Sequence, residues 1–128
     1  MIAGDLAPRD LPHAFNDGLR ALIGITPQTD RDGVLQDIHW YDGHWGYFPT
    51  YTLGALIAAQ LFAAARAAIP DLLEQIGRGE FAPLFDWLRH HVHAQGSLMS
   101  TAELVEAATG SPLGTAAFER HLRQRYLG

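Results

Sequence analysis

Apolar side chains recur at helical spacing near the start of the chain. Between residues 10 and 23 they return every three or four positions, at Leu11, Phe15, Leu19, Leu22 and Ile23. This period predicts an amphipathic helix, with Asp10 at the N-cap position and Gly24 just beyond the end. We therefore expect a first helix from Asp10 to about Ile23.

A second, longer apolar pattern follows Pro49. Residues 50–69 are apolar nearly all round, Pro49 fits the first turn of a helix, and Pro70 stops it. Such a helix is normally buried on most faces, and a chain of 128 residues has trouble covering it alone. Gln60, Arg66 and the many alanines make it a poor membrane span, so we expect no membrane partner.

Shorter helices are predicted in the remainder of the chain. Ser100 and Glu103 have the spacing of a capping box, and Gly110 ends the helix that they open. The predicted helices span 71–76, 81–93, 101–108 and 115–126. With no convincing strand pattern, the expected fold class is all-α, with residues 1–128 as one domain or a piece of a larger one.

Residues 33–48 differ from the rest of the chain. They mix aromatic side chains with His39, His44, Asp37, Asp42 and several glycines, which is too glycine-rich for a helix and too aromatic for a loose linker. We expect an ordered loop or a short hairpin packed against other parts of the protein. Functional residues often lie on rigidly held loops of this kind.

Composition removes several classes of function. The formal net charge is −5, and all nine basic residues are arginines scattered along the chain, which argues against nucleic acid as a partner. Cysteine is absent, so disulfides, thiolate metal sites and a cysteine nucleophile are ruled out. No signal peptide is recognised near the N-terminus, and we expect a cytoplasmic protein.

Histidines suggest one possible metal site. His90 and His93 lie three residues apart within the predicted 81–93 helix, with His91 between them, and could share a metal ion. We prefer to interpret these histidines as a solvent-exposed helix C-terminus, where the helix dipole favours histidine. No carboxylate lies nearby in sequence to orient a histidine as a metal ligand. The paired histidines of a helical zinc protease, spaced four apart with a glutamate after the first, do not occur.

The stretch from Gly33 to Tyr51 is the strongest candidate for chemistry. It gathers an amide, a carboxylate, an imidazole, an indole and two phenols: Gln36, Asp37, His39, Trp40, Tyr47 and Tyr51. These groups could bind a polar substrate, or their polar ends could form hydrogen bonds with backbone groups of the loop itself. The residue types alone leave both interpretations open.

The same stretch carries a family resemblance. Gly33-Val34-Leu35-Gln36-Asp37-Ile38-His39-Trp40 resembles the GxxQDxHW signature of the Taq-type carboxypeptidases, peptidase family M32. Residues 4–6 and 10–12 upstream of the signature, and residues 46–54, 79–84, 87–89 and 108–113 downstream of it, are also similar to that family, so the resemblance covers essentially the whole chain.

The resemblance implies the C-terminal part of an α-helical, neurolysin-like metallopeptidase that removes C-terminal residues from peptides. Family members typically form homodimers and hold zinc, or cobalt in its place, on an HExxH helix with a further glutamate. That portion lies upstream of the matched region and is absent here, so no metal ligand is expected in this chain. The chain would be an expressed fragment or the product of a truncated gene, inactive as a peptidase by itself.

The resemblance also implies roles for particular residues. His39 and Tyr51 are expected to stabilise the oxyanion that forms during catalysis, with Tyr47 as a competitor for the role of the phenol. Gly33, Gln36, Asp37 and Trp40 are the candidate substrate contacts. Gln36 and Asp37 could instead orient His39, and Trp40 could simply pack.

Two alternatives belong to other functional classes. The first is a stand-alone helical module that dimerises or binds a partner through the 50–69 helix, left after loss of the catalytic half. The second is a small metal-binding protein that uses His90, His91 and His93.

Overall fold

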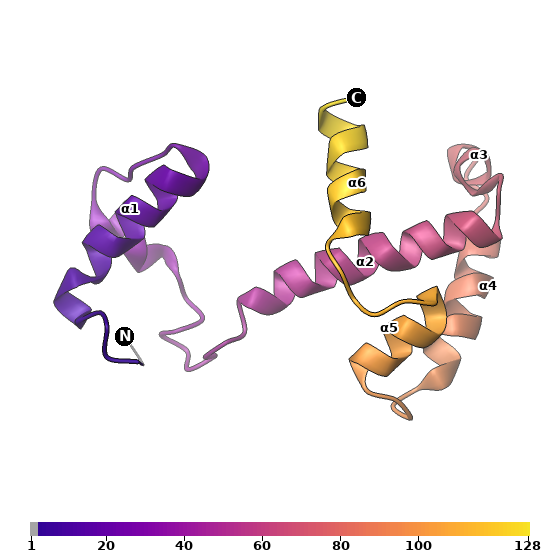
Figure 1. The fold of residues 1–128 in the computed structure, drawn as a ribbon, viewed down its shortest axis with the longest axis horizontal. Coiled ribbons are helices and arrows are strands. Elements are labelled where there is room, and N and C mark those ends of the chain that lie inside the picture. The colour runs from indigo at the N-terminus through magenta and orange to yellow at the C-terminus, as the bar shows by residue number, and fades with distance from the viewer. Residues whose placement is uncertain (1–2) are drawn as a thin grey trace. The chain divides into compact units, whose positions relative to one another are not determined.

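The computed structural model describes residues 3–128, and within that range every regular element is helical. The chain forms two compact units, one up to Phe48 and the other from Pro49 to Gly128 (Figure 1). The predicted all-α class is confirmed. Residues 33–48 form an ordered loop with a short 3-10 turn, so the hairpin alternative was wrong.

The first unit is built around α1, Leu11–Ile23. Three 3-10 turns accompany it: η1 Pro8–Asp10, η2 Asp30–Asp32 and η3 Val34–Gln36. Gly24 ends α1 in the left-handed conformation, as predicted, with φ 73°. The predicted side-chain cap by Asp10 is wrong, because η1 runs directly into α1 and leaves Asp10 with helical dihedrals, where its carboxylate makes no capping bond.

The second unit is organised along α2, Pro49–Ala68. It is followed by α3 Leu72–Gly77, α4 Ala82–His91, η4 His93–Gln95, α5 Thr101–Thr109 and α6 Ala116–Tyr126. Each of the four α-helices after α2 contacts it (Figure 1). The buried core joins Ala65 of α2, Leu72 of α3 and Trp87 of α4, and partly buried aliphatic side chains surround these three. The predicted capping box of Ser100 and Glu103 is present at the start of α5.

The predicted 81–93 helix is shorter than expected. It ends at His91, because Val92 departs from helical dihedrals with φ −121° and ψ −64°. The chain then forms η4, and Gln95 Nε2 donates to the carbonyl oxygen of His90 at 3.1 Å. His93 therefore lies outside the helix that carries His90, and the three-residue spacing on one helical face is lost.

Gln60 fastens α2 to the segment between α5 and α6. Its side chain is 8 % exposed, and its Nε2 lies within hydrogen-bond distance of Thr109 Oγ1 at 2.9 Å and of the Ser111 and Pro112 carbonyl oxygens at 3.0 and 3.1 Å. Its Oε1 accepts from the Gly114 amide at 3.1 Å. A buried amide is costly unless it is hydrogen-bonded, so these contacts fix the register of the segment on α2.

Most of the α2 surface remains uncovered in this chain. Only Gln60 and Ala65 of its 20 residues are buried, so this chain does not cover the helix by itself, which is the difficulty expected from its length. The reason is geometric, because the four helices that contact α2 have 6 to 11 residues each and cannot enclose an apolar helix of 20 residues. The helix is long and apolar enough to span a membrane by length and composition, a test that core helices of soluble proteins also pass.

Candidate functional site

Gly33 and Gln36 hold the start of the 33–48 loop in place. Gly33 is buried, and a Cβ added to it would lie 3.0 Å from two carbons of the Pro27 ring. Gln36 Nε2 donates to the carbonyl oxygen of Arg31. Both residues therefore have a structural task within the loop, beside the substrate contact predicted for them.

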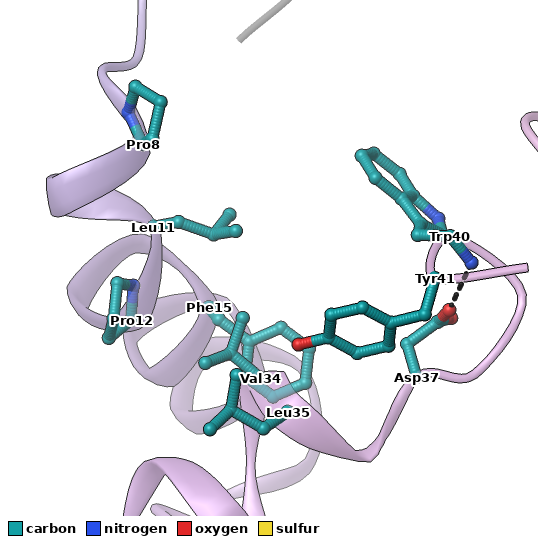
Figure 2. A pocket seen from close by; sticks show the side chains of 9 residues that line it. All are labelled: Pro8, Leu11, Pro12, Phe15, Val34, Leu35, Asp37, Trp40 and Tyr41. Atoms are coloured by element: carbon teal, nitrogen blue, oxygen red, sulfur yellow. Dashed lines mark hydrogen bonds between the residues drawn. The ribbon is translucent and has the colours of Figure 1, made fainter. Parts of the chain in front are cut away.

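Asp37 connects the two aromatic residues of the motif. Its Oδ1 accepts a hydrogen bond from the backbone N–H of Trp40 at 3.0 Å, while its Oδ2 lies 3.8 Å from Nδ1 of His39 (Figure 2 shows the bond to Trp40). An aspartate that accepts from the amide three residues on closes a tight turn. The carboxylate also stands close enough for an ion pair with the imidazole whenever that ring is protonated.

The His39 ring is held by neighbours on more than one side. Tyr47 stacks on it with ring centroids 5.5 Å apart and an interplanar angle of 24°. Phe48 meets it edge-on at 4.8 Å and 77°. With 19 % of its side chain exposed, His39 is oriented yet still accessible to a ligand. A catalytic imidazole needs this combination of fixed orientation and access.

The other aromatic residues of the loop lie nearer the surface. Trp40 is 43 % exposed and packs against Trp45, with ring centroids 4.8 Å apart. Tyr47, which stacks on His39, is 48 % exposed and also lies near His44 at 5.9 Å. The structure thus brings Asp37, His39 and Tyr47 together in one cluster.

Tyr51 belongs to the second unit. It lies in the first turn of α2 and is 58 % exposed. The N-terminal turn of a helix is the positive end of its dipole, which favours negative charge developing beside the phenol. The helix start was placed correctly from Pro49, within one residue of the structure.

A cavity of about 370 Å³ lies between α1 and the motif. Figure 2 shows its lining side chains, with the Tyr41 hydroxyl directed back toward Val34 and α1. Asp37 is the one charged residue among those that line it: Pro8, Leu11, Pro12, Phe15, Val34, Leu35, Asp37, Trp40 and Tyr41. Apolar walls with one placed polar group are typical of pockets for small molecules or single side chains.

The sequence analysis singled out Asp37 and Trp40 but missed the other residues of this cavity. The signal for Leu11 and Phe15 was present, because their four-residue spacing marks one helix face. In the structure these two side chains line the cavity, and Phe15 is 36 % exposed. Tyr41 directly follows the signature motif, and no sequence pattern marked it as a residue that lines a cavity.

The residues that could hold a metal are dispersed. Across residues 3–128, no three histidine, aspartate or glutamate side chains gather closely enough to hold a metal ion. His90 and His91 meet edge-to-face at 4.8 Å, and His91 lies against Trp87 at 4.6 Å.

Comparison with known proteins matches the chain over nearly its full length. The family model for carboxypeptidase Taq (M32) metallopeptidases matches residues 1–126. Thermostable carboxypeptidase 1 of Thermus thermophilus is 44 % identical over 98 % of this chain, which corresponds to 25 % of that relative. The chain thus spans about a quarter of the length of this curated relative.

Solved structures give the same result. Metallocarboxypeptidase 1 of Trypanosoma cruzi matches 99 % of the chain and 27 % of its own length, with a TM-score of 0.94 and 32 % identity. The M32 carboxypeptidase of Deinococcus radiodurans matches 98 % of the chain and 25 % of its own, with a TM-score of 0.93 and 40 % identity. The helical fold is therefore that of a part of such enzymes, and the chain belongs to the carboxypeptidase Taq (M32) metallopeptidase family.

Proposed function

We propose that this chain is the C-terminal part of a metal-dependent carboxypeptidase that releases C-terminal amino acids from peptides. The observation that carries the proposal is the signature loop, in which Tyr47 stacks on His39 and the Asp37 carboxylate lies beside it, within a chain that the family model matches over residues 1–126. In this proposal the loop and the start of α2 provide substrate contacts and stabilise the transition state, and the remainder of the protein provides the rest of the active site.

His39 and Tyr51 act on the carbonyl oxygen of the scissile peptide bond. As a nucleophile adds to that carbonyl, negative charge grows on the oxygen, and an N–H and an O–H aimed at it stabilise the transition state more than the substrate. The Asp37 carboxylate lies beside the imidazole, with its Oδ2 3.8 Å from Nδ1. Tyr47, stacked on His39, is the competing phenol for the same task.

The catalytic metal implied by the family does not fit the residues of this chain. No group of three potential ligands exists within its described part, and the HExxH pair is absent from the sequence. The metal ligands therefore belong to the portion of the full-length enzyme outside these residues. We propose that the chain alone binds no stoichiometric zinc and releases no C-terminal amino acids.

The test uses a full-length relative and the residues aligned with His39 and Tyr51. His39→Ala or Tyr51→Phe should lower kcat by on the order of a hundredfold, the usual cost of one lost oxyanion donor. Tyr47→Phe distinguishes the two candidate phenols, because it removes the hydroxyl of the competing tyrosine and leaves that of Tyr51. The metal content of each variant must equal that of the parent enzyme.

Two outcomes would contradict the assignment. Unchanged turnover in both His39→Ala and Tyr51→Phe would remove them from the mechanism. A large loss in Tyr47→Phe with none in Tyr51→Phe would transfer the role of the phenol to Tyr47.

A second candidate function rests on the uncovered surface of α2. Only Gln60 and Ala65 of its residues are buried, and exposed apolar surface of this size drives association. We propose that the chain pairs with a second copy through α2 when it is on its own. Light scattering after size exclusion tests this, and a monomer at high micromolar concentration would contradict it.

A further inference from the structure

A second cavity lies in the unit that begins at Pro49, between α2 and α6, which pack against each other (Figure 1). Its volume is about 270 Å³. The floor is apolar, made of alanines with Phe62 and Pro70, and the polar lining consists of Arg66 from α2 and of Arg120, His121 and Gln124 from α6. None of the residues that line it is acidic.

The two arginines of this cavity have no counter-ion of their own. Among residues 3–128 the ion pairs involve Arg20, Arg78, Arg89 and His39, and no hydrogen bond is made by the side chain of Arg66 or Arg120. Arg66 and Arg120 are two of the six arginines that form no ion pair in this part of the chain, and they line the same cavity. The chain has 14 aspartate and glutamate residues, yet no ion pair joins one of them to Arg66 or Arg120 within residues 3–128.

The acidic residues nearest in sequence are engaged elsewhere. Asp71 follows Pro70, and its Oδ2 accepts from Gln75 Nε2 at 2.8 Å. Glu119 precedes Arg120, and its Oε1 accepts from the hydroxyl of Thr115 at 2.6 Å. Neither carboxylate forms an ion pair with Arg66 or Arg120.

We propose that this cavity binds an oxyanion attached to an apolar body. A guanidinium presents a fixed fork of N–H donors that matches a carboxylate or a phosphate, and Arg66 and Arg120 supply that fork from two helices. Gln124 and His121 add donors, while Phe62 and the alanines accept an apolar body of about one ring or one aliphatic side chain.

A zwitterion fits less well than a simple anion. A free amino acid would carry an ammonium group into a site with no acidic lining residue, next to two positive charges. An apolar carboxylate or phosphate without an amine avoids that repulsion. The site is independent of the proposed oxyanion donors, since none of them lines it.

The experiment titrates the 128-residue chain by NMR with phenylacetate and, separately, with phenyl phosphate at constant ionic strength. Saturable shifts at α2 and α6 are expected for at least one of them, and the tighter of the two identifies a carboxylate or a phosphate ligand. Arg120→Gln should weaken binding about tenfold or more, as expected for a lost charge-assisted hydrogen bond. Arg66→Gln is the second variant and should act in the same direction.

Arg123→Gln is the matched control, because Arg123 lies on the same helix but outside this cavity. It should change binding less than twofold. Phenylacetamide, which keeps the body and loses the charge, should bind at least about tenfold more weakly than phenylacetate, and inorganic phosphate at least about tenfold more weakly than phenyl phosphate.

Four results would overturn the proposal. The first is that neither phenylacetate nor phenyl phosphate shows saturable binding. The second and third are that phenylacetamide binds as tightly as phenylacetate, or that inorganic phosphate binds as tightly as phenyl phosphate. The fourth is that Arg123→Gln and Arg120→Gln lose the same amount of affinity. The last would reveal a diffuse attraction to the basic helix rather than a site.

Discussion

The 33–48 loop and the helices around Gln60 are stabilised in different ways. The loop is held by backbone turns, by Asp37 and by ring contacts at the surface, and Gly33 is its one fully buried residue. The helical unit has buried apolar side chains and a buried amide that joins distant parts of the chain. The difference shows that ring contacts and turns near the surface organise the loop, while buried packing stabilises the helical unit.

Leu72→Ala should have the largest effect on stability. Leu72 is fully buried in the core with Ala65 and Trp87, and such truncations cost about 2–5 kcal/mol. Urea unfolding followed by circular dichroism measures the loss. Leu98→Ala is the control, because Leu98 is 87 % exposed, and a similar loss there would contradict the proposed location of the core.

Gln60→Leu should have the second largest effect on stability, with a loss of about 2–3 kcal/mol in the free energy of unfolding. The replacement is similar in size but leaves the amide of Gly114 and the carbonyl groups of Ser111 and Pro112 without their buried partner. Gln124→Leu, at an exposed position of α6, serves as the control. If both variants unfolded at the same urea concentration, the amide would not be a structural link.

Glu103 provides a smaller and pH-dependent contribution. Hydrogen bonds from the Ser100 hydroxyl and backbone N–H lower the pKa of this carboxyl below its ordinary 4.5. A group with a lowered pKa stabilises the fold above its unfolded pKa, and that stabilisation is lost as the pH falls through the folded value. The wild-type chain should therefore be more stable than Glu103→Gln at neutral pH.

The wild-type protein and Glu103→Gln should become equally stable in acid, once Glu103 is protonated in the folded state. Chemical unfolding between pH 7 and pH 3 measures this convergence. Glu106→Gln lies outside the capping box and should show no such pH-dependent difference. A constant difference between wild type and Glu103→Gln across this range would contradict the capping role.

Trp45→Ala should have the smallest effect on stability, within about 0.5 kcal/mol, because 59 % of Trp45 is exposed. Its size would normally make such a truncation costly in a core. A loss comparable to that of Leu72→Ala would erase the distinction between loop and helices. Unfolding should be followed by a probe within residues 3–48, since the two units need not unfold together.

Much of the fold could be predicted from local patterns. The end of α1 at Gly24, the start of α2 at Pro49 and the capping box of α5 depend on residues within a few positions of one another. The end of α4 at His91 did not follow from its apolar period, because the period continues through Val92 while the backbone turns. What distinguishes this boundary is the Val92 backbone and the bond from Gln95 to the His90 carbonyl, which the apolar period does not encode.

The site was only partly predictable, for a similar reason. The signature motif located Asp37, His39 and Trp40, since they are adjacent in sequence. The cavity that joins Asp37 and Trp40 to Leu11 and Phe15 needs two segments to meet, and no local pattern encodes that meeting. The same holds for Arg66 and Arg120, which lie on helices far apart in sequence.

The central claim is that an imidazole and a phenol from this chain stabilise the transition state rather than the bound substrate. The most direct measurement compares, in a full-length relative, the effect of Tyr51→Phe on kcat/KM with its effect on binding of a phosphinic peptide that mimics the tetrahedral intermediate. Both should fall by the same factor, on the order of a hundredfold, while KM changes little. A raised KM with unchanged kcat and unchanged inhibitor binding would contradict the account.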